Sequence, residues 1–161
     1  MDADALIRLV LRFILVPLGA TAAIAAGTAV ILVAHHDALA TLFEAGPQAQ
    51  EDYFLSLVFA GPLLVVLLSI WAFHMFVPAM IGVAIAEALA VRSWVYHAAN
   101  GAIAAWLGWA LTRDIREEYR FLTEPKVLIA AGLLAGLAYW VVAGWTAGFW
   151  KPLGRLQKPV P

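Results

Sequence analysis

The longest stretch of this chain without a charged residue runs from Tyr53 to Ala86. As one helix it would measure about 51 Å, well beyond the roughly 30 Å hydrocarbon core of a bilayer. Only 13% of the 161 residues are charged and 64% are apolar, whereas soluble domains contain about 25% charged and about 45–50% apolar residues. A chain of this size cannot hide so much apolar surface in its own core. We therefore predict that residues 1–161 form a single integral membrane domain covered by the lipid bilayer.

Charge and composition exclude several classes of function. The net charge of −1 gives no basic patch for nucleic acid, so we expect no nucleic-acid partner. The absence of cysteine excludes disulfides, thiolate catalysis and cysteine-bound metal. The chain also lacks a nucleophile elbow, a phosphate loop and the two-histidine zinc spacing. We predict no catalytic residue and no metal site, and the sequence favours a non-enzymatic role.

Four uncharged segments predict transmembrane helices, at about 13–34, 54–78, 93–112 and 127–150. The expected fold is all-α, with the four helices packed as a small bundle. An alternative divides 53–86 into two spans joined by a tight hairpin at "FHMFVP", which would give five crossings. That turn would contain no Gly, Asn or Asp and no cation, so four crossings are favoured.

The loop between the first two predicted spans sets the orientation. Residues 35–52 include four acidic residues and no Lys or Arg. Because cytoplasmic loops carry the excess of Lys and Arg, we expect this loop outside and both termini in the cytoplasm.

Small residues recur at every fourth position in the first and last spans, which places them on one face of each helix. Such stripes let helix backbones approach closely in lipid. They favour a compact bundle, and a homo-oligomer or a subunit of a membrane complex. The predicted packing residues are Gly19, Ala23, Gly27, Gly132, Gly136, Gly144 and Gly148.

A small group of polar residues precedes and enters the third span. We interpret Glu87 and Arg92 as markers of the inner membrane boundary, with Glu87 in contact with water. Ser93, His97 and Asn100 share one helical face and are expected to hydrogen-bond between helices. The alternative makes Glu87 and Asn100 part of a small proton-coupled transporter or channel, because ionisable residues within the bilayer are usually functional.

His74 and His97 allow a second alternative. If the second helix spans residues 53–76, both histidines lie near the inner side, where two axial histidines on antiparallel helices could hold haem b. A quinone site would use similar residues. Apart from this alternative we predict no cofactor.

The segments "AEALAVRSW" (86–94) and "AYWVVAGWTAG" (138–148) resemble those of small uncharacterised four-helix inner-membrane proteins of proteobacteria. The resemblance implies a multi-pass protein of the bacterial inner (plasma) membrane and brings no activity with it. The predicted function is therefore a structural or accessory one, exerted through helix–helix contacts with itself or with a larger membrane complex.

Overall fold

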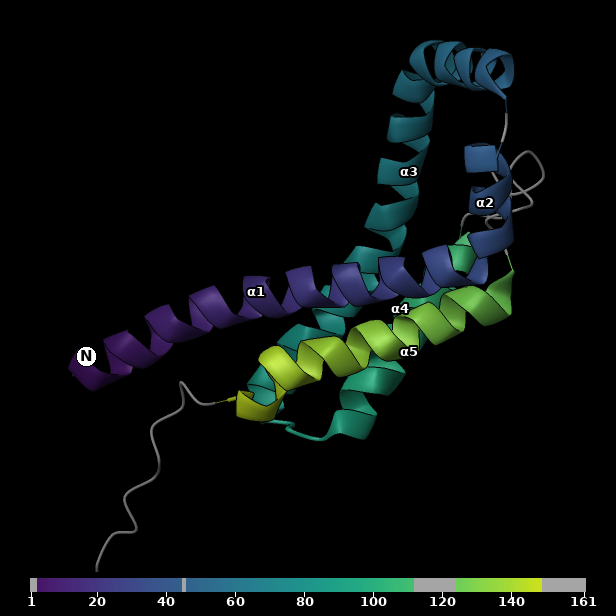
Figure 1. The fold of residues 1–161 in the computed structure, drawn as a ribbon. Coiled ribbons are helices and arrows are strands. Elements are labelled where there is room, and N and C mark those ends of the chain that lie inside the picture. The colour runs from purple at the N-terminus through teal and green to yellow at the C-terminus, as the bar shows by residue number, and fades with distance from the viewer. Residues whose placement is uncertain (1–2, 45, 112–123, 149–161) are drawn as a thin grey trace, which may run out of the picture.

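The computed structural model describes residues 3–44, 46–111 and 124–148 (Figure 1). It is 91% helical, and no strand occurs among the described residues, which confirms the all-α prediction. The elements follow in the order α1 (Ala3–Ala34), α2 (His36–Glu44), α3 (Pro47–Leu89), α4 (Trp94–Leu111), α5 (Pro125–Val142) and the short 3-10 helix η3 (Gly144–Thr146).

The order of the helices in space differs from their order in the chain. α5 packs between α1 and α4, and α3 packs against α4. In Figure 1, α1 continues at its N-terminal end beyond α5 and η3, and the first half of α3 stands away from the other helices. The bundle is therefore built from α1, α4, α5 and the second half of α3.

Among the described residues, three helices are long and apolar enough to cross a membrane, over Leu6–Ala34, Ala72–Leu89 and Pro125–Val142. α4 lies where the third span was predicted, but it carries Tyr96, His97 and Asn100, which lower its hydropathy. Two of the three candidates overlap the predicted spans 13–34 and 127–150, whereas Ala72–Leu89 shares only residues 72–78 with the predicted span 54–78. The count of four crossings stays a prediction.

α3 runs without interruption through Phe73–Pro78, so the tight hairpin of the five-crossing alternative is not formed. The helix extends past both ends of the predicted span 54–78. Gly46 caps its start and Pro47 occupies the first turn, a position where the missing N–H of proline costs nothing. It ends at Leu89. Ala90 still donates its N–H to the carbonyl of Ala86, and its left-handed backbone (φ 56°) turns the N–H of Val91 onto the same carbonyl at 2.8 Å.

The last helix is shorter than the span 127–150 predicted for it. α5 ends at Val142, because Ala143 leaves helical geometry (φ −129°, ψ −34°) and Gly144–Thr146 tighten into η3. Gly148 then adopts φ +73°, and a Cβ there would collide with the Cβ of Ala90. Glycine is required at this position on both counts.

The backbones of α4 and α5 touch at glycines. A Cβ added at Gly132 would meet the carbonyl oxygen of Gly101, and one added at Gly136 would meet the carbonyl oxygen of His97. On the opposite side of α5, the Cβ position of Gly19 lies 2.8 Å from the Cβ of Ala143.

The other small residues of the predicted stripes also lie at contacts. The Cβ position of Gly27 lies 3.6 Å from Ala135, and Ala23 packs on the cluster of Val83, Tyr139 and Ala143. The stripe of the last span is therefore shared between a helix, at Gly132 and Gly136, and the turn that follows it.

We expect Gly136→Ala to lower the free energy of unfolding by about 1–3 kcal/mol, the usual effect of overpacking. The new methyl group would meet backbone atoms of His97 and Ala98, which cannot rotate away. Gly27→Ala is the matched control, since its methyl group would make only ordinary contacts at 3.6 Å. Unfolding in detergent, followed by circular dichroism, compares the two variants. Equal stability of both would contradict the close approach of α4 and α5.

Candidate functional site

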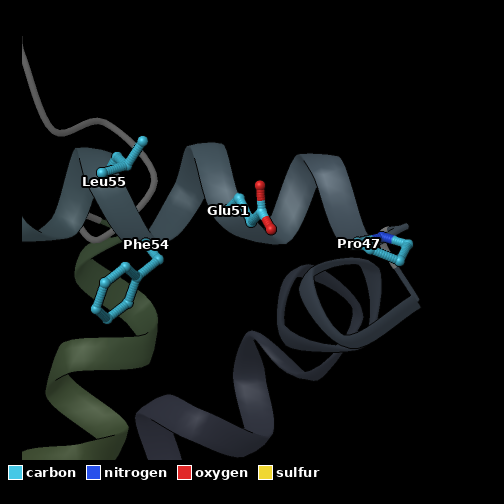
Figure 2. Close-up of a pocket in the computed structure, with 4 residues that line it drawn as sticks. All are labelled: Pro47, Glu51, Phe54 and Leu55. Carbon is cyan, nitrogen blue, oxygen red and sulfur yellow. The ribbon is translucent and has the colours of Figure 1, made fainter.

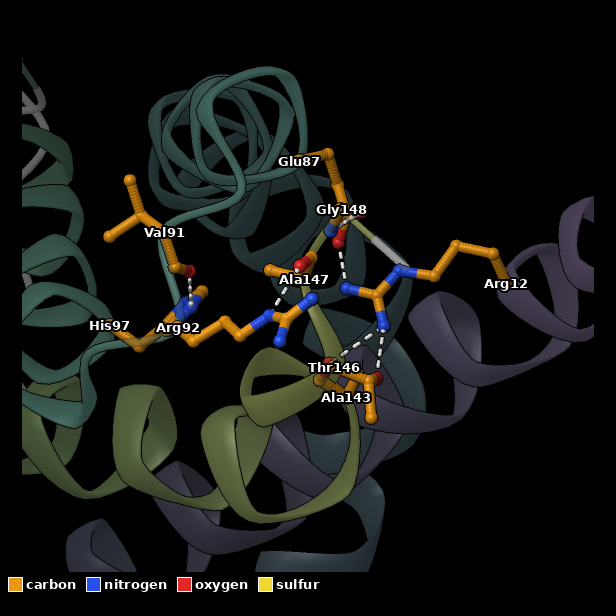
Figure 3. A network of polar contacts seen from close by, with 9 residues as sticks. All are labelled: Arg12, Glu87, Val91, Arg92, His97, Ala143, Thr146, Ala147 and Gly148. Carbon is orange, nitrogen blue, oxygen red and sulfur yellow. Dashed lines mark hydrogen bonds and ion pairs between the residues drawn. The ribbon is translucent and has the colours of Figure 1, made fainter. Parts of the chain in front are cut away.

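Polar groups from four elements converge at one end of the bundle (Figure 3). Arg12 reaches in from α1, Glu87 comes from the last turn of α3, and Arg92 lies in the α3–α4 linker. All three meet the chain segment Ala143–Gly148, which follows α5. We call this set of residues the polar end.

Arg12 and Glu87 form an ion pair through Nη2 and Oε1, with only 7% and 16% of their side chains exposed. The other terminal nitrogen of Arg12, Nη1, donates to the carbonyl oxygen of Ala143 and to the hydroxyl oxygen of Thr146, both at 2.7 Å. The Thr146 hydroxyl in turn donates to Ala143 at 2.9 Å. One guanidinium therefore joins α1, α3 and the turn after α5.

The second oxygen of the Glu87 carboxylate is also engaged. Oε2 accepts the N–H of Gly148 at 3.1 Å. Arg92 donates from Nε to the carbonyl of Ala147 at 3.1 Å, and the indole N–H of Trp140 donates to the carbonyl of Arg92 at 2.8 Å. The expectation that Glu87 stands in water does not hold: it is mostly buried and both its oxygens are bonded.

The energetics of such a pair are asymmetric. Bringing two charges out of water costs about as much as their attraction returns, but removing one partner leaves an uncompensated buried charge. The intact pair therefore contributes little free energy by itself, but the loss of either partner would destabilise the polar end strongly. A carboxylate held in this way is a structural element.

His97 lies beside the polar end and is 1% exposed. Its Nε2 lies 3.3 Å from the carbonyl of Val91, and because a carbonyl can only accept, Nε2 carries the proton. Its ring lies 5.4 Å, centroid to centroid, from the rings of Tyr96 and Tyr139. Among the described residues, neither Nδ1 of His97 nor the hydroxyl of Tyr139 has a hydrogen-bond partner.

Side chains in the first turns of α4 donate hydrogen bonds to carbonyl groups of α3. The amide of Asn100 donates to the carbonyl of Ala79 at 3.0 Å, and the hydroxyl of Tyr96 donates to the carbonyl of Gly82 at 2.8 Å. A Cβ at Gly82 would collide with the Asn100 amide, so the absence of a side chain there makes room for the bond. Asn100 thus makes the interhelical contact expected of its helical face.

The two histidines of the haem alternative lie at different levels. Met75, next to His74, contacts Gly108 near the end of α4, whereas Gly82 contacts Asn100 near its start. Along the α3 axis, His74 is therefore roughly 16 Å from the level of His97. Two axial ligands must both reach one iron, and this arrangement does not bring the pair together.

Arg12 and Thr146 are the site residues that sequence reasoning missed. Arg12 looked like a flanking cation because the first span was started at Phe13. The apolar window in fact begins at Leu6 and contains Arg12. A charge inside an apolar helix predicts a partner of opposite charge elsewhere in the membrane, and that signal would have pointed to Glu87.

A separate hollow of about 480 Å³ lies at the start of α3, lined by Pro47, Glu51, Phe54 and Leu55 (Figure 2). It is open along the exposed side of the helix, and Glu51 is the charged member of its lining. It brings no set of polar groups together, so the polar end remains the candidate site.

Within the described ranges, no three His, Cys, Asp or Glu residues lie close enough to hold a metal ion. No protein-family model, no curated protein and no solved structure matches the chain. The resemblance to small inner-membrane proteins therefore stays a prediction.

Arg12→Gln and Glu87→Gln should each lower the free energy of unfolding by about 3–5 kcal/mol, because each leaves a buried charge without its partner. The double variant should cost clearly less than the two losses added together, since neither charge remains. Chemical denaturation in mixed micelles measures the free energy of unfolding of the wild type, the two single variants and the double variant.

Glu51→Gln, which changes an exposed carboxylate, is the control and should leave the free energy unchanged. Strictly additive losses in Arg12→Gln and Glu87→Gln would mean that the two side chains do not depend on each other.

Proposed function

We propose that this chain is an integral membrane protein of structural or accessory type. It would act in a bacterial inner membrane through helix–helix contacts with itself or with a larger complex, with both termini cytoplasmic. The observation that carries the proposal is the contrast between the charged side chains of the polar end, which are bound within the chain, and the apolar helix faces, which are exposed. Arg12, Glu87 and Arg92 bind one another or the backbone of the same chain, while long apolar faces of α1 and α3 are left uncovered.

One uncovered face of α3 supports contacts beyond the bundle. Phe59, Val66 and Phe73 follow one another at seven-residue intervals, so they share a side of the helix, and they are 82%, 54% and 63% exposed. The glycines of α5 already face α4, and Gly19 and Gly27 of α1 already face α5 and the residue that follows it. The α3 face is therefore the better candidate for binding a second copy or a partner helix.

The distribution of charge supports the orientation. At the polar end, Arg8, Arg12 and Arg92 outnumber Glu87. α2 and the first turns of α3, at the opposite end of α1, carry acidic residues and no Lys or Arg between residues 36 and 52. The lack of Lys and Arg between residues 36 and 52 favours an outer position for that end, which supports a cytoplasmic position for the polar end.

The two alternatives remain testable predictions. A purified protein with no Soret absorption would remove haem held by His74 and His97. A Glu87→Gln variant that keeps full in-cell function would remove carboxylate-coupled transport through Glu87 and Asn100. The occupied oxygens of Glu87 and the separation of the histidines favour the structural role over both.

Phe59→Ala combined with Phe73→Ala should weaken recovery of a second copy or partner by about tenfold, because exposed aromatic residues supply much of the energy of such contacts. Native mass spectrometry of the full chain, extracted in a mild detergent, measures this recovery. Phe13→Ala is the matched control, since Phe13 of α1 is also 82% exposed. A wild-type chain recovered only as a partnerless monomer would overturn the proposal.

A further inference from the structure

The segment Ala143–Gly148 covers the polar end and is held from three sides (Figure 3). Arg12 binds its first part, at Ala143 and Thr146. Glu87 and Arg92 bind its last part, at Gly148 and Ala147. No side chain of α5 itself makes these four bonds, so the segment depends on α1, α3 and the linker for its position.

Three of the four bonds depend on the negative charge of Glu87. The bond from Gly148 ends on the carboxylate directly. The two bonds from Arg12 persist only while the guanidinium stays in place, and it is almost fully buried with Glu87 as its counter-charge. An unpaired arginine near a membrane surface turns its head towards water. Loss of the Glu87 charge would therefore release Ala143 and Thr146 and weaken the bond from Gly148, while the bond from Arg92 stays unchanged.

The segment also covers His97. The Cβ position of Gly144 lies 2.9 Å from both Nε2 and Cδ2 of the imidazole, so the backbone of η3 rests on the ring. Tyr139 and Tyr96 enclose other sides of the ring. The imidazole is 1% exposed in this closed arrangement. Displacement of Gly144 would open a way to it.

We infer that the Arg12–Glu87 pair is a charge latch on the segment Ala143–Gly148. When Glu87 loses its charge, the segment opens and admits water and small solutes to His97. The helix contacts stay closed, because the glycine contacts between α4 and α5 involve neither member of the pair. The opening is local, and it needs no partner, so it stands independently of the proposed function.

Native histidines report the opening without any added label. Diethyl pyrocarbonate modifies accessible imidazoles, and the chain contains no cysteine to compete for it. His36 serves as the internal reference, since its side chain is 73% exposed. Peptide mass spectrometry of the full chain in detergent micelles gives the rate at His97 relative to that at His36.

In Glu87→Gln the relative rate at His97 should rise at least about tenfold, as expected for a local opening. Glutamine keeps an oxygen for Gly148, so the change tests the charge. In the double variant Arg12→Gln/Glu87→Gln the rate should stay as high as in Glu87→Gln, because the Arg12 bonds that hold Ala143 and Thr146 are absent in both. Glu51→Gln should leave the rate unchanged.

Protection of His97 in Glu87→Gln at the wild-type level would overturn the latch. So would a wild-type rate in the double variant, since the segment would then stay closed without the Arg12 bonds. Should Glu87→Gln fail to fold, Glu87→Asp replaces it: aspartate keeps the charge, is one methylene too short to reach both Arg12 and Gly148, and should still raise the rate. An unchanged rate in Glu87→Asp would equally overturn the proposal.

Discussion

The architecture depends on the direct contact between the backbones of α4 and α5. In lipid, apolar side chains gain little by leaving one apolar surface for another, so helices associate through close packing. Gly101, Gly132 and Gly136 remove the side chains that would keep the two helices apart, and their carbonyl groups fill the space. α1 then packs on the other side of α5 at Gly19, and α3 packs on the other side of α4. Without the α4–α5 contact neither outer helix would have a surface to join.

Polar interactions add to this packing. Neutral hydrogen bonds lie along the helix contacts, and charged groups lie at one end of the bundle. Along the α3–α4 contact, Asn100 and Tyr96 donate to backbone carbonyls of the neighbouring helix, bonds worth roughly 0.6–2 kcal/mol each in a membrane. Charged groups gather at one end, where three elements end or begin and the backbone offers free carbonyl and N–H groups. Arg12, Glu87 and Arg92 satisfy several of these groups. The same contacts help to fix the position of the chain after α5, where the helical hydrogen bonds include the one from Ala143 to Tyr139 and the short ones of η3.

Composition and spacing were sufficient to predict the helical membrane-compatible class, because both depend on sums over many residues. The interhelical role of Asn100 could be predicted from its place on a helical face with His97. The end of α5 at Val142 could not be predicted from the sequence, because Gly144 and Gly148 continue the four-residue spacing of Gly132 and Gly136. Only tertiary contacts stop the helix there. The ion pair could not be predicted either, because its partners stand 75 positions apart and nothing local connects Arg12 with Glu87.

The position of Arg12 within α1 explains why this side chain needs a counter-charge at the polar end. The apolar window begins at Leu6, so Arg12 lies about 9 Å further along the helix axis. A lone cation at that depth would have to extend towards the headgroups or draw water inwards. Glu87 removes this requirement by supplying the opposite charge from the last turn of α3. The N-terminal turns of α1 can therefore remain in apolar surroundings beyond the end of α5, and the first helix can be longer than those it packs against. Its length is thus a consequence of the pair.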